Sequence, residues 1–275
     1  MCTFLYIRAM NKFTFIASVC AALFFAACGD DSSSVEPSLD ESSSSVVLSS
    51  SSSSAVIPSS SSVSSPMSSW SGGGAGAIGS MTDSRDGQSY KTVSIGSQTW
   101  MAQNLNYETA SSYCYSNTPS NCTKYGRLYT WAAAMDSAGT WSSNGKGCGD
   151  AKTCTPTYPV RGVCPTGWHL PTKAEFETLF TAVGGSSTAG KMLKSTSGWN
   201  SGGNGTDNYS FSALPAGDRY DNEGYDFEGS SAFIWNSTEY GSYGAYCMDL
   251  DYDYDDAYLG YGSKHSWFSV RCVKD

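Results

Sequence analysis

The stretch CPTGWHLPTKAEFETLFTAVGG, from Cys164 to Gly185, carries the clearest structural signal in this 275-residue chain. Thr172 followed by Glu175 forms a capping box, in which the two side chains satisfy backbone amides at the start of a helix. Gly184 and Gly185 end the pattern, as glycine commonly does after a helix. The stretch therefore predicts an amphipathic helix packed on a core. Its apolar residues recur every three or four positions: Phe176, Leu179, Phe180 and Val183.

Two preceding segments predict further elements. In VSIGSQTW, Val93 and Ile95 come before Gly96 and Ser97, and a two-residue connection with glycine first favours a hairpin with a type II′ turn. In GRLYTWAAAM, apolar residues at helical spacing predict a short helix. These residues are Leu128, Trp131, Ala132 and Met135.

The N-terminus has the parts of a secretory signal. Arg8 and Lys12 precede an apolar run that ends at Ala27. The run is too short for a comfortable membrane span, and small residues stand where a signal peptidase would cut. We therefore expect residues 1–27 to be a signal peptide, with an uncleaved N-terminal anchor as the alternative. Translation could begin at Met10, which starts a more ordinary signal.

The cleavage point resembles a bacterial lipobox, Phe25-Ala26-Ala27-Cys28, although Phe departs from the commonest first residue. In that motif the cysteine is acylated once the signal is removed, so we expect lipid on Cys28. The resemblance implies a membrane-anchored lipoprotein of the outer membrane or cell surface, with its domain outside the cytoplasm.

Serine dominates residues 28–80, as in ESSSSVVLSSSSSSAVIPSSSSVSSPMSSW. Such a segment has too little apolar surface to offset its chain entropy, and it predicts a flexible tether. Residues 81–275 have the size of one domain with its own core. With Arg8 and Lys12 removed, 14 basic and 25 acidic side chains remain, a net charge of about −11. This charge disfavours nucleic-acid binding, since no basic patch is present to displace counterions.

Seven cysteines remain once two leave with the signal and Cys28 is acylated. In an exported protein, cysteines favour disulfides. Two short turn-rich loops are each closed by a pair, Cys114 with Cys122 and Cys148 with Cys154. Zinc is not indicated, because CxxC pairs are lacking and the chain has only two histidines. Three cysteines are then left, of which one must stay unpaired: Cys164, Cys247 and Cys272.

Five aspartates crowd into CMDLDYDYDD, from Cys247 to Asp256. Alternation by twos is typical of a half-exposed strand. An EF-hand loop started at Asp249 or at Asp251 lacks the required Gly and Glu, so no metal site is predicted. We expect an exposed strand with a solvated acidic row and an apolar row against the core or a neighbouring strand. The acidic row is Asp249, Asp251, Asp253 and Asp255, and the apolar row is Met248, Leu250, Tyr252 and Tyr254.

Several ordered blocks together resemble the Fibrobacter succinogenes major paralogous domain across residues 83–275. They include DGQSYKTVSIGSQTWMAQNLNY, CTKYGRLYTWAAAM, CPTGWHLPTKAEFETL, WNSTEY and the terminal FSVRCVKD. More distantly, GWHLPTKAEFE and SVRCVKD are similar to blocks of the formylglycine-generating, sulfatase-modifying family, which has a C-type-lectin-like fold. The resemblance implies an α+β domain with short helices, small irregular antiparallel sheets and chain ends close together.

The wider fold also implies a third disulfide. In it, a cysteine just before the capped helix is bonded to one in the last strand, which here means Cys164 with Cys272. Cys247 would then be the unpaired thiol: a free thiol, a partner for another chain, or a small buried apolar residue.

An enzyme of the formylglycine-generating branch is the main alternative function. Cys247 lies close to where those enzymes keep one of two active cysteines, but the upstream segment EYGSYGAY has none. His169 has no identifiable nucleophile beside it, which favours a structural hydrogen bond over a general base. No pair of carboxylates suggests glycoside hydrolysis. We therefore expect no catalytic residues, and a purely structural envelope component remains a third possibility.

Binding has better support in the sequence. Ten of the 18 tyrosines lie between Tyr209 and Tyr261, among Gly, Ser, Asn and Asp. Such surfaces offer large amphipathic contacts at low entropic cost. We expect a non-catalytic domain for an extracellular carbohydrate or protein, with no cofactor; calcium is left open, although the sugar-binding signatures of C-type lectins are absent. The expected ligand-facing residues are Tyr220, Tyr225, Tyr243, Asp249, Asp251 and Asp253.

Overall fold

The computed structural model describes residues 76–220 and 224–275. The expected signal, Cys28 and nearly all of the expected tether lie outside these residues. Residues 78–80, assigned to the tether from their composition, instead belong to a strand that pairs along its full length with the next one. No helix in the described part is long and apolar enough to cross a membrane.

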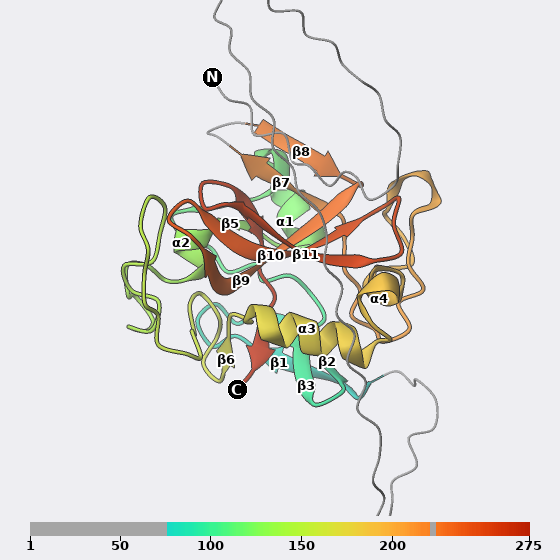
Figure 1. Ribbon diagram of the computed structural model, residues 1–275, viewed down its shortest axis with the longest axis horizontal. Coiled ribbons are helices and arrows are strands. Elements are labelled where there is room, and N and C mark those ends of the chain that lie inside the picture. Colours follow the sequence, from blue (N-terminus) through green and yellow to red (C-terminus); the bar gives the residue numbers. More distant parts are fainter. Residues whose placement is uncertain (1–75, 221–223) are drawn as a thin grey trace, which may run out of the picture. The chain divides into compact units, whose positions relative to one another are not determined.

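The domain is α+β, with short helices and two sheets (Figure 1). Its helices are η1 (Tyr115–Asn117), α1 (Pro119–Tyr125), α2 (Trp131–Ala134), α3 (Lys173–Ala182), α4 (Ser186–Leu193) and η2 (Asn200–Gly202). Its strands are β1 (Ile78–Thr82), β2 (Ser89–Ile95), β3 (Gln98–Met101), β4 (Ser112–Tyr113), β5 (Leu128–Thr130), β6 (Trp168–His169), β7 (Ala216–Tyr220), β8 (Gly224–Glu228), β9 (Ser231–Tyr240), β10 (Gly244–Asp251), β11 (Ala257–Ser263), β12 (Trp267–Ser269) and β13 (Val273–Lys274).

The smaller sheet has the strand order β1-β2-β3-β13-β6. The expected hairpin joins β2 to β3, and Ile95 pairs with Gln98 across the two-residue turn. Gly96 supplies the positive φ, +58°, that the first turn position requires. Because β1 and β13 share this sheet, the two ends of the domain lie close together, as expected.

The larger sheet has the order β11-β10-β9-β7-β12-β5-β4, and β8 pairs with β7 outside this order. Most neighbours are antiparallel, whereas β9 makes short parallel pairings with β7 and β12. β9 and β10 are the longest strands. They form the centre on which both hydrophobic cores are built.

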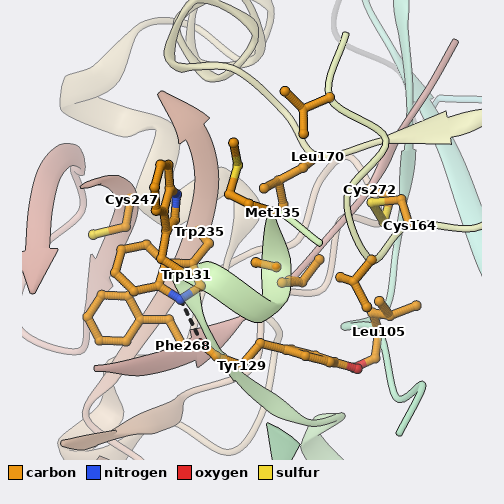
Figure 2. Packing of buried hydrophobic residues seen from close by; sticks show 14 of the residues in the cluster. Leu105, Tyr129, Trp131, Met135, Cys164, Leu170, Trp235, Cys247, Phe268 and Cys272 are labelled. Carbon is orange, nitrogen blue, oxygen red and sulfur yellow. Dashed lines mark hydrogen bonds between the residues drawn. A yellow bond between two sulfur atoms is a disulfide. The ribbon is translucent and has the colours of Figure 1, made fainter. Parts of the chain in front are cut away.

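The first core lies on one face of the larger sheet (Figure 2). The rings of Trp235 and Phe268 stack at 4.2 Å between centroids. Each buried indole donates to a backbone carbonyl oxygen, Trp235 to Tyr129 and Trp131 to Asn236, both at 2.8 Å. These aromatic side chains are therefore both packed and hydrogen-bonded.

The second core fills the space between the opposite face and the smaller sheet, where α3 lies (Figure 1). The capping box at Thr172 and Glu175 is present, and the helix stops at Ala182 before the two glycines. Phe176 stacks on Trp100 of the smaller sheet at 5.2 Å between centroids. The predicted apolar stripe thus joins the two sheets, and all four of its residues are buried.

Three disulfides stabilise the domain. They join the expected pairs, Cys114 with Cys122, Cys148 with Cys154, and Cys164 with Cys272. Cys247 is free and buried.

Two expectations about elements were wrong. Leu128 does not begin a helix, because residues 128–130 pair with β12 and the helix starts only at Trp131. The acidic stretch is not an exposed strand: β10 lies between β9 and β11, and it ends at Asp251. Met248 and Leu250 face the second core as expected, but Asp249 is only 2% exposed.

Candidate binding surface

Three tyrosines gather on one face of the larger sheet, one from each of its last three long strands. The Tyr240 ring stacks on that of Tyr261 at 3.9 Å between centroids and 19° between planes. Tyr246 meets Tyr240 edge-on at 5.3 Å. Tyr240 and Tyr261 are 46% and 52% exposed, and Tyr246 is partly buried. We call these three residues the tyrosine face.

Strand register explains why they meet. Tyr246 of β10 is directly opposite Tyr261 of β11, and Tyr240 of β9 is opposite Gly244, two residues before Tyr246. Same-face neighbours at these spacings are within reach of aromatic side chains. The three rings therefore form a row across the strands.

The N-terminus of α3 borders this row. The backbone amide of Lys173 donates to Thr238 Oγ1 of β9 at 3.0 Å, which fixes the helix end on the sheet. Lys173 Nζ lies 5.6 Å from the centre of the Tyr246 ring. The neighbouring Tyr261 raises the pKa of Tyr240, so the Tyr240 phenol stays neutral and able to donate a hydrogen bond near neutral pH. The face is thus aromatic and rich in hydroxyl groups, with the Lys173 ammonium at its border.

The six residues expected to face a ligand do not come together. Tyr220 and Tyr225 belong to the β7–β8 hairpin, and the Tyr225 hydroxyl donates to Asn117 Oδ1 at 2.8 Å. Tyr243 lies in the turn that joins β9 to β10 and is 66% exposed.

The three aspartates of that set also differ in their surroundings. Asp249 is buried in the sheet. Asp251 ends β10 and accepts hydrogen bonds from the Ser231 hydroxyl and the Asp253 amide. Asp253 is exposed in the turn that follows. A common ligand surface for the six residues is therefore not formed within one domain.

A polar groove lies elsewhere, beside α1 and the start of the smaller sheet. One part of it has a volume of about 680 Å³ and a second part about 700 Å³. The parts share Gln88, Asn106, Cys122 and Thr123. Its side chains already bond to one another, as when Asn106 Nδ2 donates to Gln88 Oε1 at 3.2 Å. The groove is hydrophilic but lacks an exposed aromatic row.

Cys247 has the wrong surroundings for thiol chemistry. Burial, with the nearby Asp249 and Asp218 carboxyls, raises its pKa well above that of an ordinary thiol. Reactive cysteines need the reverse, a cationic and accessible environment that favours the thiolate. No group of three or more His, Cys, Asp or Glu in the described part could hold a metal ion.

His169 is held by two carboxylates. Its Nδ1 is 2.7 Å from Asp275 Oδ1, and its Nε2 is 2.8 Å from Glu175 Oε1. Burial opposes protonation, but the two carboxylates outweigh it and raise the pKa of His169. The imidazole thus links the helix cap to the chain terminus, a structural role that fits the sequence expectation.

Tyrosine is the residue type that the sequence indicated, but the tyrosines that lie together form a different set. Tyr240 and Tyr246 stand in EYGSYGAY and Tyr261 in LGYGS, with no local pattern that joins them. Their meeting depends on the β9–β10–β11 register, which includes a bulge between Ala245 and Cys247. The alternation in β10 and β11 could have placed Tyr246 and Tyr261 on one face, had their pairing been known.

Fold and surface together define a disulfide-bonded α+β domain with an exposed aromatic sheet face. The family model of the Fibrobacter succinogenes major domain matches residues 93–274. The chain therefore belongs to this family, as its sequence blocks indicated. Comparison with curated proteins finds no match, and neither does comparison with solved structures. The distant similarity to the sulfatase-modifying family and the C-type-lectin-like assignment are not confirmed by these comparisons.

Proposed function

We propose that the protein is a cell-envelope lipoprotein that displays a non-catalytic domain, and that its tyrosine face binds an extracellular carbohydrate. The observation that carries the proposal is the row formed by Tyr240, Tyr246 and Tyr261. Aromatic rings stack on the C–H faces of sugars, while phenol hydroxyls bond to sugar hydroxyls. Tyr240 and Tyr261 cover one face of each other's ring, so the row offers a sugar chain the remaining exposed ring faces, the ring edges and the hydroxyl groups.

The chemistry of the exposed surface favours a carbohydrate over a protein ligand. Of the nine large apolar side chains that are exposed in the described part, seven are tyrosines. Protein interfaces are enriched in Trp, Phe, Met and Arg as well as Tyr, and neither Trp nor Met is among the exposed side chains of the described part. Here the exposed apolar area consists almost entirely of phenol rings, which remain partly hydrated until a polar ligand replaces the water.

An enzyme of the formylglycine-generating type is disfavoured by the burial of Cys247. A thiol reagent should leave Cys247 unmodified in the native protein and label it after unfolding, with intact protein mass as the readout. Rapid labelling of native Cys247 would instead favour the enzyme.

Binding is tested with a glycan array and with insoluble polysaccharides, with and without calcium. Replacing both Tyr240 and Tyr261 by Ala should abolish retention of the protein on the polysaccharide. The unfolding temperature of this variant should fall no further than that of a control variant. Tyr220→Ala is the matched control, because Tyr220 is also 50% exposed but ends β7 and does not belong to the tyrosine face. Equal binding by the two variants, or binding only to a protein ligand, would contradict the proposal.

The envelope location is tested separately. Mass spectrometry of the mature N-terminus should find an acylated Cys28, and Cys28→Ser should release the protein from the membrane fraction. An unmodified Cys28 would remove the lipoprotein part of the proposal and leave carbohydrate binding untouched.

A further inference from the structure

The edge strand β11 lacks the sequence features that usually block pairing with another chain. Edge strands are commonly protected by charged residues, proline, bulges or short length. Residues 257–263, AYLGYGS, contain neither charge nor proline, and their register with β10 is unbroken. β11 is also the longest edge strand of the described sheets, with seven residues against five in β1 and β8.

One hydrogen bond shows which backbone groups of β11 point away from the sheet. The amide of Lys264 donates to the carbonyl oxygen of Tyr243 at 2.9 Å, one step beyond the paired residues Gly244 and Ser263. Hydrogen-bonded and non-bonded pairs alternate along an antiparallel ladder. The amides of residues 258, 260 and 262 therefore face β10, and those of 257, 259, 261 and 263 face away from the sheet.

Little in the described part occupies that outer edge. The Ser263 carbonyl accepts a hydrogen bond from the Ser266 amide, which closes the following turn. The backbone groups of Leu259 and Tyr261 make no hydrogen bond with another described element. α4 contacts both β11 and the segment just before it, where the Lys191 amide donates to the Asp255 carbonyl oxygen. The centre of β11 is thus available as a pairing edge.

We propose that β11 pairs antiparallel with β11 of a second copy of this chain, about a two-fold axis at Gly260. This register uses all seven residues of both strands. It places Leu259 opposite Tyr261 of the second copy in a hydrogen-bonded pair, and the symmetry repeats that pair. In this register the outward backbone amides and carbonyls of one strand are opposite those of the other, so they can form hydrogen bonds.

Side chains support the same register. On one face, Leu259 meets a tyrosine, an aliphatic–aromatic pair of the kind that stabilises sheets. On the other face, Tyr258 lies opposite Gly262 of the second copy, where an aromatic ring covers a glycine. The strand begins after three aspartates, Asp253, Asp255 and Asp256, whereas Lys264 at its other end is buried and paired with Glu239. Antiparallel pairing keeps the acidic ends of the two strands apart, whereas a parallel arrangement would place acid against acid.

The pairing has a consequence for the tyrosine face but does not depend on it. Because the two-fold axis is perpendicular to the sheet, the tyrosine faces of both copies lie on the same side of a continuous sheet. If the proposed carbohydrate binding holds, one polymer could contact both rows, and the second contact would be intramolecular. The dimer itself requires only the edge strands.

Cysteine cross-linking of the full chain tests both pairing and register. Chains carrying Leu259→Cys and Tyr261→Cys, with different tags, are co-expressed and mildly oxidised in the membrane. Opposite residues in a hydrogen-bonded pair are about 5.5 Å apart between Cα atoms, which suits a disulfide. Two copies of either single variant place the new cysteines diagonally, about 7–8 Å apart, where a disulfide does not form without movement.

The expected result is a reducible dimer of the two tagged chains, at least about tenfold more abundant than dimers of either variant alone. Thr178→Cys, on the exposed side of α3, replaces one partner as the control and should give no cross-link. Analytical ultracentrifugation of the unmodified chain in detergent should give the mass of a dimer. This measurement does not depend on whether the cysteine variants fold. A monomer mass without cross-linking would overturn the proposal, as would equal cross-linking by single variants. Carbohydrate binding by a monomer would leave the proposed function standing while this inference fails.

Discussion

The guanidinium of Arg271 is buried in the domain and donates hydrogen bonds to three different residues. Its side chain donates to Asn104 Oδ1 at 2.7 Å, to the Ser212 carbonyl oxygen at 2.8 Å and to the Phe211 carbonyl oxygen. Burial lowers the pKa of Arg271 to about 9, so it remains charged at neutral pH. The residue thereby ties the loop before β7 to the segment between β12 and β13.

Replacing Arg271 by Met should destabilise the domain by about 3–5 kcal/mol, because three buried acceptors lose their donor. Arg271→Lys should cost less, since an ammonium keeps the charge and some of the donors but not the planar fork. Urea unfolding of the two variants at pH 7 gives the comparison. A Met variant within about 1 kcal/mol of the unmodified protein would show that these hydrogen bonds add little net stability.

Asp218 makes stability depend on pH. Burial and the facing charge of Asp226 raise its pKa to about 7 from an ordinary value of 3.8. In the folded protein the carboxyl therefore keeps its proton up to about pH 7, whereas in the unfolded chain it ionises near pH 4. This contribution to stability is complete below pH 4 and is lost as the pH rises towards 7.

The variant Asp218→Asn should remove that loss. We expect it to be more stable than the unmodified protein at pH 8, by about 2–4 kcal/mol, with a smaller difference at pH 4.5. Urea unfolding across this pH range measures the effect, and Asp253→Asn, in an exposed turn, is the control. Parallel pH profiles for Asp218→Asn and the unmodified protein would contradict the assignment.

At the scale of elements, α3 could be predicted completely because every signal that defines it is local. Thr172 and Glu175 begin the helix, the apolar stripe selects its buried side and Gly184 follows its end. The segment 128–130 could not be assigned in this way. Its strand exists only because Tyr129 pairs with Phe268, far along the chain.

The strand β10 shows a different limit of sequence reasoning. Its alternation identified a strand and placed Met248 and Leu250 in the core. The same alternation predicted a solvated aspartate row, but Asp249 is buried and lies opposite Phe233, a residue of the first core. Only the packing of distant aromatic residues decides that both faces of this strand are covered. For the same reason the sequence could not assemble the tyrosine face.

The cap of α3 offers a test at this scale. Thr172→Ala should reduce the free energy of unfolding by about 1 kcal/mol, because the Glu175 amide loses the Thr172 hydroxyl as its acceptor. Thr172→Ser retains that oxygen and should remain close to the unmodified protein. Urea unfolding at pH 7 compares the two. If the Ala and Ser variants are equally stable, the capping hydroxyl does not contribute to the fold.

At the scale of the whole domain, the Cys164–Cys272 disulfide joins two residues that are far apart in the sequence. Cys164 precedes α3, and Cys272 stands between β12 of the larger sheet and β13 of the smaller one. Most of the buried residues of the second core lie between these two cysteines. The bond thus joins the start of that region to the junction of the two sheets.

Chain entropy predicts how the disulfides should rank. The Cys164–Cys272 bond spans 108 residues, and replacing both cysteines by Ala should cost about 4–5 kcal/mol. The Cys114–Cys122 bond spans only 8 residues, for which the same model gives about 2–3 kcal/mol. The variant Cys247→Ala measures the loss in unfolding free energy when one buried sulfur that forms no cross-link is removed. Subtracting twice this loss from that of the Cys164/Cys272 variant leaves the contribution of the disulfide itself. Equal losses for the two disulfide variants, measured by urea unfolding, would mean that native packing and not loop closure determines their effect. A larger loss for the Cys164/Cys272 variant would show that loop closure determines the ranking of the two disulfides.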